Sequence, residues 1–195
     1  MPPLPSSSNA KQLARTDKRD SYFPGAAERI WDRKKSGGYA TIPKTLLLIS
    51  HLLGKFEKDD YIPSTLLGLW LATWDNGFID IGGEADFALE CGFLQKNLNR
   101  RIYEWRRRIE KLEAARFIEV VRSGEKNVRY VLVLNPHQAF SDLYASNDTF
   151  RNRVKGNLQW RTVLDQLIDK AFDVGARELA VALREDLHAT HTGEE

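Results

Sequence analysis

The chain has 195 residues, is 42% hydrophobic, and carries 29 Lys and Arg against 27 Asp and Glu, for a formal net charge of +2. A chain of this length buries one ordinary core with elements added to it, so we expect one domain with appendages rather than two full domains. The near-neutral total excludes no class of partner, so only the distribution of charge along the chain is informative.

Cysteine content and apolar runs limit the compartment and the kinds of site. Cys91 is the only cysteine, which excludes an intrachain disulfide and a cysteine-based zinc site within one chain. No signal-peptide pattern opens the sequence, and its apolar runs are far too short to span a bilayer. We therefore expect a cytoplasmic protein that does not bind membranes.

The first part of the chain predicts a basic N-terminal arm. Residues 1–38 hold eight basic and four acidic side chains. The opening is rich in proline and serine and nearly lacks apolar residues, so we expect disorder to about residue 20. A short helix is predicted over 21–31, and Ser36-Gly37-Gly38 interrupts the chain before the next element. We place a domain boundary after residue 38.

Residues 39–135 predict a domain that begins with two helices. A similar pattern, Ile-Pro followed by Thr-Leu-Leu, starts at Ile42 and again at Ile62. Proline is tolerated in the first turn of a helix and the leucines supply a buried face, so each copy predicts a helix start. We expect the first helix over 43–54 and the end of the second at Asp75-Asn76-Gly77, a turn signal.

Short β segments are predicted on either side of the central helices. The alternating residues 78–81 predict a strand, and residues 84–91 predict a short helix stopped by Gly92, the residue type suited to the left-handed position after a helix. Residues 117–122 and 128–134 are rich in β-branched and aromatic residues and are joined by a five-residue polar turn. They predict a hairpin.

The clearest periodicity lies in residues 96–115, which predict a long amphipathic helix. Its apolar stripe consists of Leu98, Ile102, Trp105, Ile109 and Leu112. The opposite face is cationic and carries Lys96, Arg100, Arg107 and Lys111. Over residues 96–122, nine basic side chains stand against four acidic ones, so this segment is strongly positive within a near-neutral protein.

Residues 136–195 predict a helical C-terminal appendage. A first helix follows Asn135-Pro136, and two more amphipathic helices are separated by Gly175. Their apolar stripes consist of Trp160, Val163, Leu164, Leu167 and Ala171, and of Leu179, Leu183 and Leu187. Such stripes must be covered, either by the helix at 43–54 or by a second chain. We slightly favour a homodimer.

Residues 63–134 thus give a helix, a short strand, a short helix, a glycine turn, a long basic helix and a hairpin. The most characteristic residues are Phe87-Ala88-Leu89-Glu90-Cys91-Gly92-Phe93, Leu98, Arg101-Ile102, Ile109, Leu112-Glu113 and Phe117-Ile118. This pattern resembles the winged-helix DNA-binding superfamily, in particular bacterial transcriptional regulators and plasmid replication initiators. The resemblance implies a mainly α fold with a small antiparallel β wing, a winged helix-turn-helix followed by C-terminal helices. It implies sequence-specific binding of double-stranded DNA in transcription regulation or in plasmid replication and maintenance.

The residues of the long helix suit this role independently of the resemblance. A major groove about 12 Å wide admits one helix, whose exposed N-terminal part supplies donors to base edges and cations to phosphates. Asn and Gln pair with adenine, Arg pairs with guanine, and Lys binds phosphate. The candidate DNA-binding residues are Gln95, Lys96, Asn97, Asn99, Arg100, Arg101, Tyr103 and Arg107 on the helix, and Lys126 and Arg129 on the wing.

Two other interpretations are weighed against DNA binding. A charged helix face is often only a solvated face, and a winged helix can serve as a protein–protein interaction adaptor without DNA specificity. Enzymatic function is not expected, because the sequence has no glycine-rich phosphate loop and no nucleophile, base or paired carboxylates at informative spacing. We also expect no metal and no cofactor.

Overall fold

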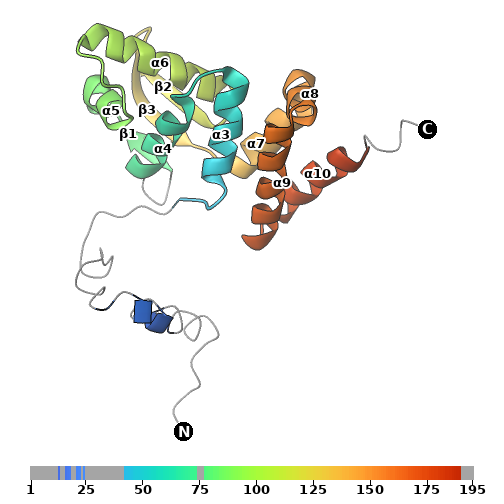
Figure 1. Ribbon diagram of the computed structural model, residues 1–195. Coiled ribbons are helices and arrows are strands. Elements are labelled where there is room, and N and C mark those ends of the chain that lie inside the picture. The colour runs from blue at the N-terminus through green and yellow to red at the C-terminus, as the bar shows by residue number, and fades with distance from the viewer. Residues whose placement is uncertain are drawn as a thin grey trace. The chain divides into compact units, whose positions relative to one another are not determined.

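The computed structural model describes residues 42–73 and 77–189, together with residues 13, 16–18, 21–22 and 24 (Figure 1). The chain divides into two units, Met1–Tyr39 and Ala40–Glu195, and all the helices and strands named below belong to the second. The predictions of a disordered arm, a helix over 21–31 and a break at 36–38 lie outside the described residues or touch them only at single positions.

The first part of the second unit contains four helices and a small sheet. Its elements are α3 (Leu46–Glu57), α4 (Ile62–Ala72), β1 (Phe78–Asp80), α5 (Glu84–Glu90), α6 (Leu98–Ala114), β2 (Ile118–Ser123) and β3 (Asn127–Val133). The three strands form one antiparallel sheet in the order β1-β3-β2. The prediction of a mainly helical chain with a small antiparallel sheet is confirmed.

The two similar helix starts fold differently. Pro63 lies in the first turn of α4, as predicted. In contrast, α3 begins only at Leu46, whose N–H donates to the carbonyl of Pro43 at 3.0 Å. Thr45 is buried, and its Oγ1 lies 2.6 Å from Nε2 of His137. The prediction of a helix over 43–54 is therefore wrong at its start, because a turn tied to a distant histidine replaces the first helical turn.

The sheet has an apolar inner face toward the helices. Val131 of β3 pairs with Ile79 on one side and Val120 on the other, and Val131 and Ile79 are buried. The register shifts between Val121 and Arg122, just before the hairpin turn. Such a bulge increases the local twist of a strand. The bulge here lies where the hairpin extends beyond the three-stranded part of the sheet.

The core of this part is built around the inner face of α6. Trp105 is 0% exposed, and its ring lies 5.9 Å from that of Phe87 on α5. Helix α4 approaches the end of α5 so closely that a Cβ on Gly68 would lie 2.5 Å from Sγ of Cys91. Burial raises the pKa of Cys91 to about 12, so this thiol is a small core residue.

The apolar stripe of the long helix is shorter than predicted. Trp105, Ile109 and Leu112 are fully buried, but Leu98 is 52% exposed. The first turn of α6 lies at the edge of this part of the structure in Figure 1. The periodicity is correct for the second half of the helix and wrong for Leu98.

The C-terminal part consists of four helices where three were predicted. They are α7 (Pro136–Ser146), α8 (Asp148–Gly156), α9 (Leu158–Asp173) and α10 (Arg177–Ala189). The missed helix α8 is defined by its ends, because the side chains of Asn147 and Asn157 accept N–H groups at the starts of α8 and α9. Its buried residues are only Phe150 and Val154, too few to give a readable stripe.

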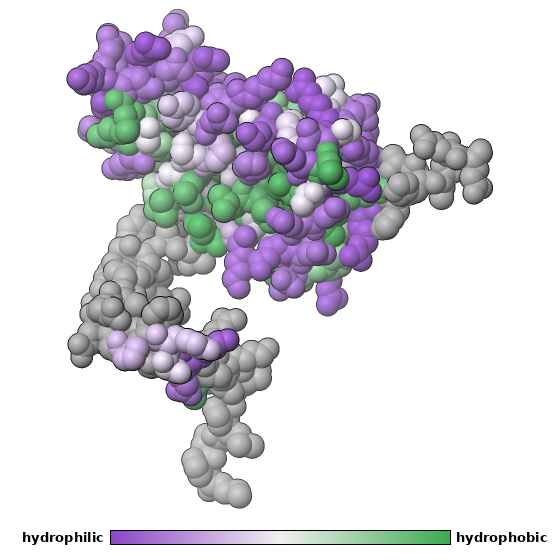
Figure 2. All heavy atoms as spheres, in the orientation of Figure 1, coloured by the Kyte–Doolittle hydropathy of each residue, from purple (hydrophilic) through white to green (hydrophobic). Residues whose placement is uncertain are grey.

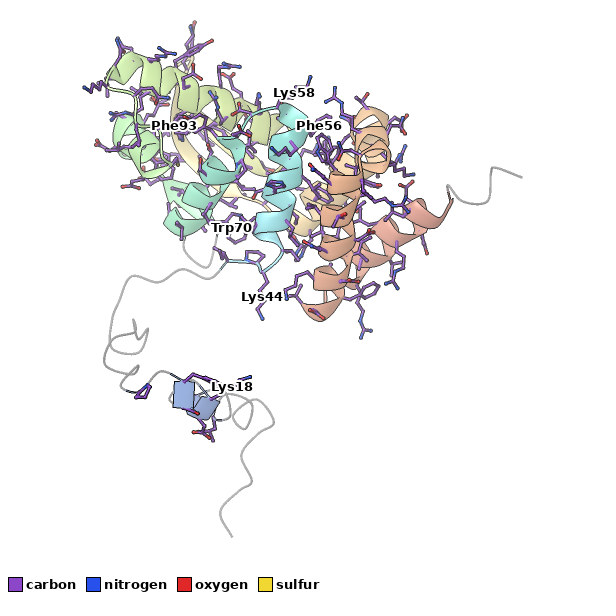
Figure 3. All side chains as sticks on the ribbon, viewed as in Figure 1. Lys18, Lys44, Phe56, Lys58, Trp70 and Phe93 are labelled. Atoms are coloured by element: carbon purple, nitrogen blue, oxygen red, sulfur yellow. The ribbon has the colours of Figure 1, made fainter. Side chains whose placement is uncertain are left out.

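The stripes of α9 and α10 are covered within the same chain. Helix α9 packs against α3 on one side and α10 on the other (Figure 1). Leu164, Leu167 and Leu183 are buried, and Phe56 of α3 points toward the C-terminal helices, with its ring 4.7 Å from that of Phe150 (Figure 3). These stripes therefore need no second chain, which removes the sequence argument that favoured a homodimer.

We predict that Trp105→Ala lowers the free energy of unfolding by about 3–5 kcal/mol, because a large aromatic side chain is removed from a packed core. Urea unfolding measures the change. The control is Leu158→Ala, at a side chain that is 80% exposed, which should change stability by no more than about 0.5 kcal/mol. Equal effects of the two substitutions would contradict the central position of Trp105.

Candidate nucleic-acid interface

A buried carboxylate in the loop between α3 and α4 holds the second half of α6. Asp59 is 7% exposed. Its Oδ1 accepts a hydrogen bond from Nε of Arg108 at 3.1 Å, and its Oδ2 lies 3.1 Å from Nζ of Lys111. Burial alone would raise the pKa of Asp59, but the hydrogen bond from Lys111 and the charge of Arg108 hold that pKa below its ordinary value.

Arg108 is enclosed on all sides by protein groups. Its Nη1 donates to the backbone carbonyl of Glu104 at 2.8 Å and also binds the Glu104 carboxylate. Its guanidinium carbon lies 5.4 Å from the ring centre of Tyr61 and 5.6 Å from that of Phe93, and those two rings stack on each other. Phe93, labelled in Figure 3, follows α5 in the chain, so Arg108 joins α6 to two other segments.

A second carboxylate fixes the hairpin to α6. Glu84, in the first turn of α5, accepts a hydrogen bond from Nε of Arg106 at 2.9 Å and another from the N–H of Val128 at 2.8 Å. Arg106 also donates to the side chain of Asn127 at 2.6 Å. Near the other end of α6, Nη1 of Arg122 on β2 donates to Glu113 at 3.1 Å. The helix and the hairpin are thus positioned by charged hydrogen bonds inside the chain.

These pairs change the charge estimate made from the sequence. Five of the nine cations in residues 96–122 form ion pairs with carboxylates of this chain, namely Arg106, Arg107, Arg108, Lys111 and Arg122. Lys111, which the periodicity places on the exposed cationic face, is directed instead to Asp59. That prediction is wrong because Asp59, 52 residues earlier, lies beside the turn of α6 that carries Lys111.

Several polar side chains in α6 and in the segment just before it are exposed to solvent. Lys96, Asn99 and Arg100 are exposed, and Lys96 and Arg100 form no ion pair with the described residues. Arg107 is 46% exposed on its side chain, and its nearest carboxylate, that of Glu104, is 3.7 Å away. Tyr103 is 61% exposed. Figure 2 shows that the surface over α6 is mostly hydrophilic.

Three of the predicted contact residues are directed toward their own chain. Arg101 donates from Nε and Nη2 to the carbonyl of Gln95 at 3.1 and 2.8 Å, and the side-chain oxygen of Gln95 is buried. Arg129 pairs with Asp80 at 3.2 Å, on the strand next to its own. Asn97 has a structural role as well, because its side chain accepts the N–H of Arg100 at 3.0 Å and caps α6.

The hairpin tip and the helix enclose a hollow that the sequence did not indicate. Its volume is about 660 Å³, and its lining includes Asn99, Ile102, Tyr103 and Arg107 of α6 and Lys126 of the hairpin. The helical residues share this side because they are spaced three or four positions apart. The hollow brings Lys126 to the same place as three of the predicted helix residues.

Sequence reasoning also missed an apolar component of this surface. Leu94 is 75% exposed and lies in the segment that leads into α6, and Leu98 opens the helix. Apolar side chains at such a position can contact the methyl group of thymine. Leu94 follows the buried Phe93 directly and belongs to no periodic pattern, so no local pattern indicated its exposure.

The described part of the chain has neither a metal-binding cluster nor a membrane-spanning helix. Within residues 42–73 and 77–189, no three His, Cys, Asp or Glu side chains are grouped so that they could hold a metal ion. No helix of the described ranges is long and apolar enough to cross a membrane. Comparison with protein families, curated proteins and solved structures found no match to this chain.

We predict that Asp59→Asn lowers the free energy of unfolding at pH 7 by about 3 kcal/mol, because it removes one partner of a buried ion pair. The folded-state pKa of Asp59 is depressed, so its stabilisation is present above the ordinary aspartate pKa of about 3.9 and is lost as the pH falls through the folded value. The difference between the variant and the wild type should therefore shrink toward pH 3.

Urea unfolding at pH 7 and at pH 3 checks this prediction. The matched control is Asp60→Asn, at the neighbouring carboxylate, whose side chain is 94% exposed and 3.9 Å from Lys55. This control should change stability by no more than about 0.5 kcal/mol at either pH. A loss for Asp59→Asn that is the same at both pH values would contradict the role of its charge.

Proposed function

We propose that this protein binds double-stranded DNA through the first half of α6 and the β2–β3 hairpin. The observation that carries the proposal is the division of cations along α6. Arg108 and Lys111 are bound by Asp59, whereas Arg100 in the first turn of α6 and Lys96 just before the helix are exposed to solvent. A surface whose cations are not paired internally attracts phosphates.

The order of the elements supports the same function. A helix, a strand, two helices and a hairpin follow one another in α4, β1, α5, α6, β2 and β3, which is the order in the winged-helix proteins that the sequence resembles. In such an arrangement the N-terminal part of the second of the paired helices enters the major groove. We therefore propose a winged helix-turn-helix in which α6 is the recognition helix.

Individual roles follow from exposure and chemistry. Asn99 and Arg100 are assigned to base edges, because an amide pairs with adenine and a guanidinium with guanine. Lys96 and Arg107 are assigned to phosphates, and Lys126 at the hairpin tip to the backbone beside the groove. This proposal assigns no DNA contact to Gln95, Arg101 or Arg129. Their polar groups are either bound to other groups of the protein or buried in it.

In this proposal the protein is a cytoplasmic DNA-binding protein and not an enzyme. The two biological roles that the resemblance suggests, transcriptional regulation and plasmid replication or maintenance, share the same requirement for a sequence-specific contact. The chain would bind without a cofactor, because donors and cations of its own side chains supply every contact named above.

A second candidate function is a protein–protein adaptor. Leu47 of α3 and Leu71 of α4 are exposed, as is Leu67 to a smaller extent, and Figure 2 shows hydrophobic side chains gathered over these two helices (Figure 2). Contiguous apolar surface is typical of protein interaction sites. In the adaptor hypothesis the cations of α6 have no specific ligand.

We predict a strongly salt-dependent affinity for duplex DNA. If Lys96, Arg100, Arg107 and Lys126 each neutralise one phosphate, the logarithm of the binding constant should fall with the logarithm of salt concentration at a slope of about −4. Fluorescence anisotropy with a labelled random duplex, from low to physiological salt, measures the slope. A flat response or an absence of binding at low salt would discard DNA binding and leave the adaptor hypothesis.

We also predict that Arg100 of α6 contributes to the sequence preference of DNA binding, whereas Lys44, far from α6, does not. Arg100→Ala should weaken binding to the best site selected from a random duplex pool by about 1–3 kcal/mol, and should relax the preference at one base pair. The control is Lys44→Ala, which removes the same charge at an exposed position far from α6 (Figure 3). Equal losses for the two variants would show that only net charge matters.

A further inference from the structure

The open hollow between α6 and the hairpin is large enough for a small ligand and is lined mainly by polar and charged side chains. Its volume of about 660 Å³ lies within the range of pockets that hold small ligands, about 300–1,000 Å³. Ile102 gives it an apolar part, while Asn99 and Glu110, about three turns apart on α6, supply an amide and a carboxylate. Tyr103 lies between them on the same helix.

The charges around the hollow are nearly balanced. Arg106 and Arg122 line it, but both are bound to carboxylates, those of Glu84 and Glu113. The remaining lining charges are the cations Arg107 and Lys126 against the anions Glu110 and Glu125. The lining as a whole is therefore nearly neutral and draws a phosphate into the hollow only weakly, while Arg107 and Lys126 stay assigned to phosphates outside it. The hollow suits a neutral group with hydrogen-bonding edges.

The aromatic ring in the lining suits a nucleobase. Tyr103 is 61% exposed, and no described residue stacks on its ring. Stacking of one base on an aromatic side chain contributes about 1–3 kcal/mol to binding, and the contribution depends little on which base is stacked. The Asn99 amide and the Glu110 carboxylate can accept hydrogen bonds from an exocyclic amino group, as adenine and cytosine carry. In a paired base that group and both ring faces are already occupied.

We propose that this hollow binds one unpaired base with an exocyclic amino group, extruded from the DNA that α6 contacts. The base stacks on Tyr103, and its amino group donates to Asn99 or Glu110. This inference rests on the proposed DNA binding and extends it to a preference for duplexes with an unpaired adenine or cytosine. Entry of a base requires it to leave the stack, which is easiest where it has no partner.

The test compares two duplexes of the same sequence, one fully paired and one with a single unpaired adenine at its centre. We expect the wild type to bind the second about tenfold more tightly, the lower part of the range for one stacked base. Tyr103→Phe should keep this ratio because it keeps the ring. Tyr103→Leu, which keeps apolar volume without a ring face, should bring the ratio close to one.

Leu158→Ala is the control, at an exposed side chain of α9 outside the hollow, and it should keep the ratio of the wild type. Melting temperatures establish that both Tyr103 variants are folded. A second measurement replaces the unpaired adenine with 2-aminopurine, whose fluorescence falls on stacking. Its fluorescence should fall with the wild type and with Tyr103→Phe and stay high with Tyr103→Leu.

The outcomes separate this inference from the proposed function. Equal affinity of the wild type for the two duplexes overturns the base-binding hollow and leaves duplex binding intact. A preference that Tyr103→Leu retains also overturns it, because the site is then elsewhere. Failure to bind either duplex at low salt overturns the proposed function, and the inference with it.

Discussion

The buried carboxylate of Asp59 is the constraint on which the orientation of α6 depends. A charge that is taken out of water must be matched by opposite charge and hydrogen bonds, and Asp59 obtains both from Arg108 and Lys111. These residues lie in the second half of α6, so that half is held against the α3–α4 loop. The first turn with Arg100, and Lys96 just before it, are left exposed to solvent. The same pairing therefore stabilises the fold and selects which cations remain for a ligand.

The candidate interface is a preformed surface because its supports are internal. Trp105 fills the space between α6 and α5, and Glu84 holds Arg106 and the hairpin together through hydrogen bonds of 2.8 and 2.9 Å. A recognition element held in this way loses little conformational entropy on binding. The chain is near neutral overall, yet Lys96 and Arg100 are exposed and form no ion pair with the described residues, and net charge alone conceals this.

Local patterns predicted most elements, whereas long-range pairs determined the site. Helix periodicity and the hairpin turn are encoded within short segments, so α6 and the strands were foreseeable. Arg108 and Asp59 are 49 positions apart, so no periodic pattern shows that Arg108 is paired inside the protein and not free for a ligand. Thr45 and His137 are 92 positions apart, so the start of α3 at Leu46 is not visible in a local pattern either. The packing of α3 against the apolar stripe of α9 likewise depends on tertiary contacts that a local pattern does not encode. The exposure of Arg100 and Tyr103 was foreseeable, but the hollow beside them required the position of the hairpin.

The most direct test of the account maps the bound surface residue by residue. Backbone amide NMR spectra of the full chain would be recorded at low salt with and without a short DNA duplex. The account predicts that the largest shift changes fall within residues 96–107 and 124–127, while the amides of Asp59 and of α9 and α10 change little. Changes centred on α9 and α10, or none with excess duplex, would contradict the claim that the first half of α6 is the DNA-binding surface.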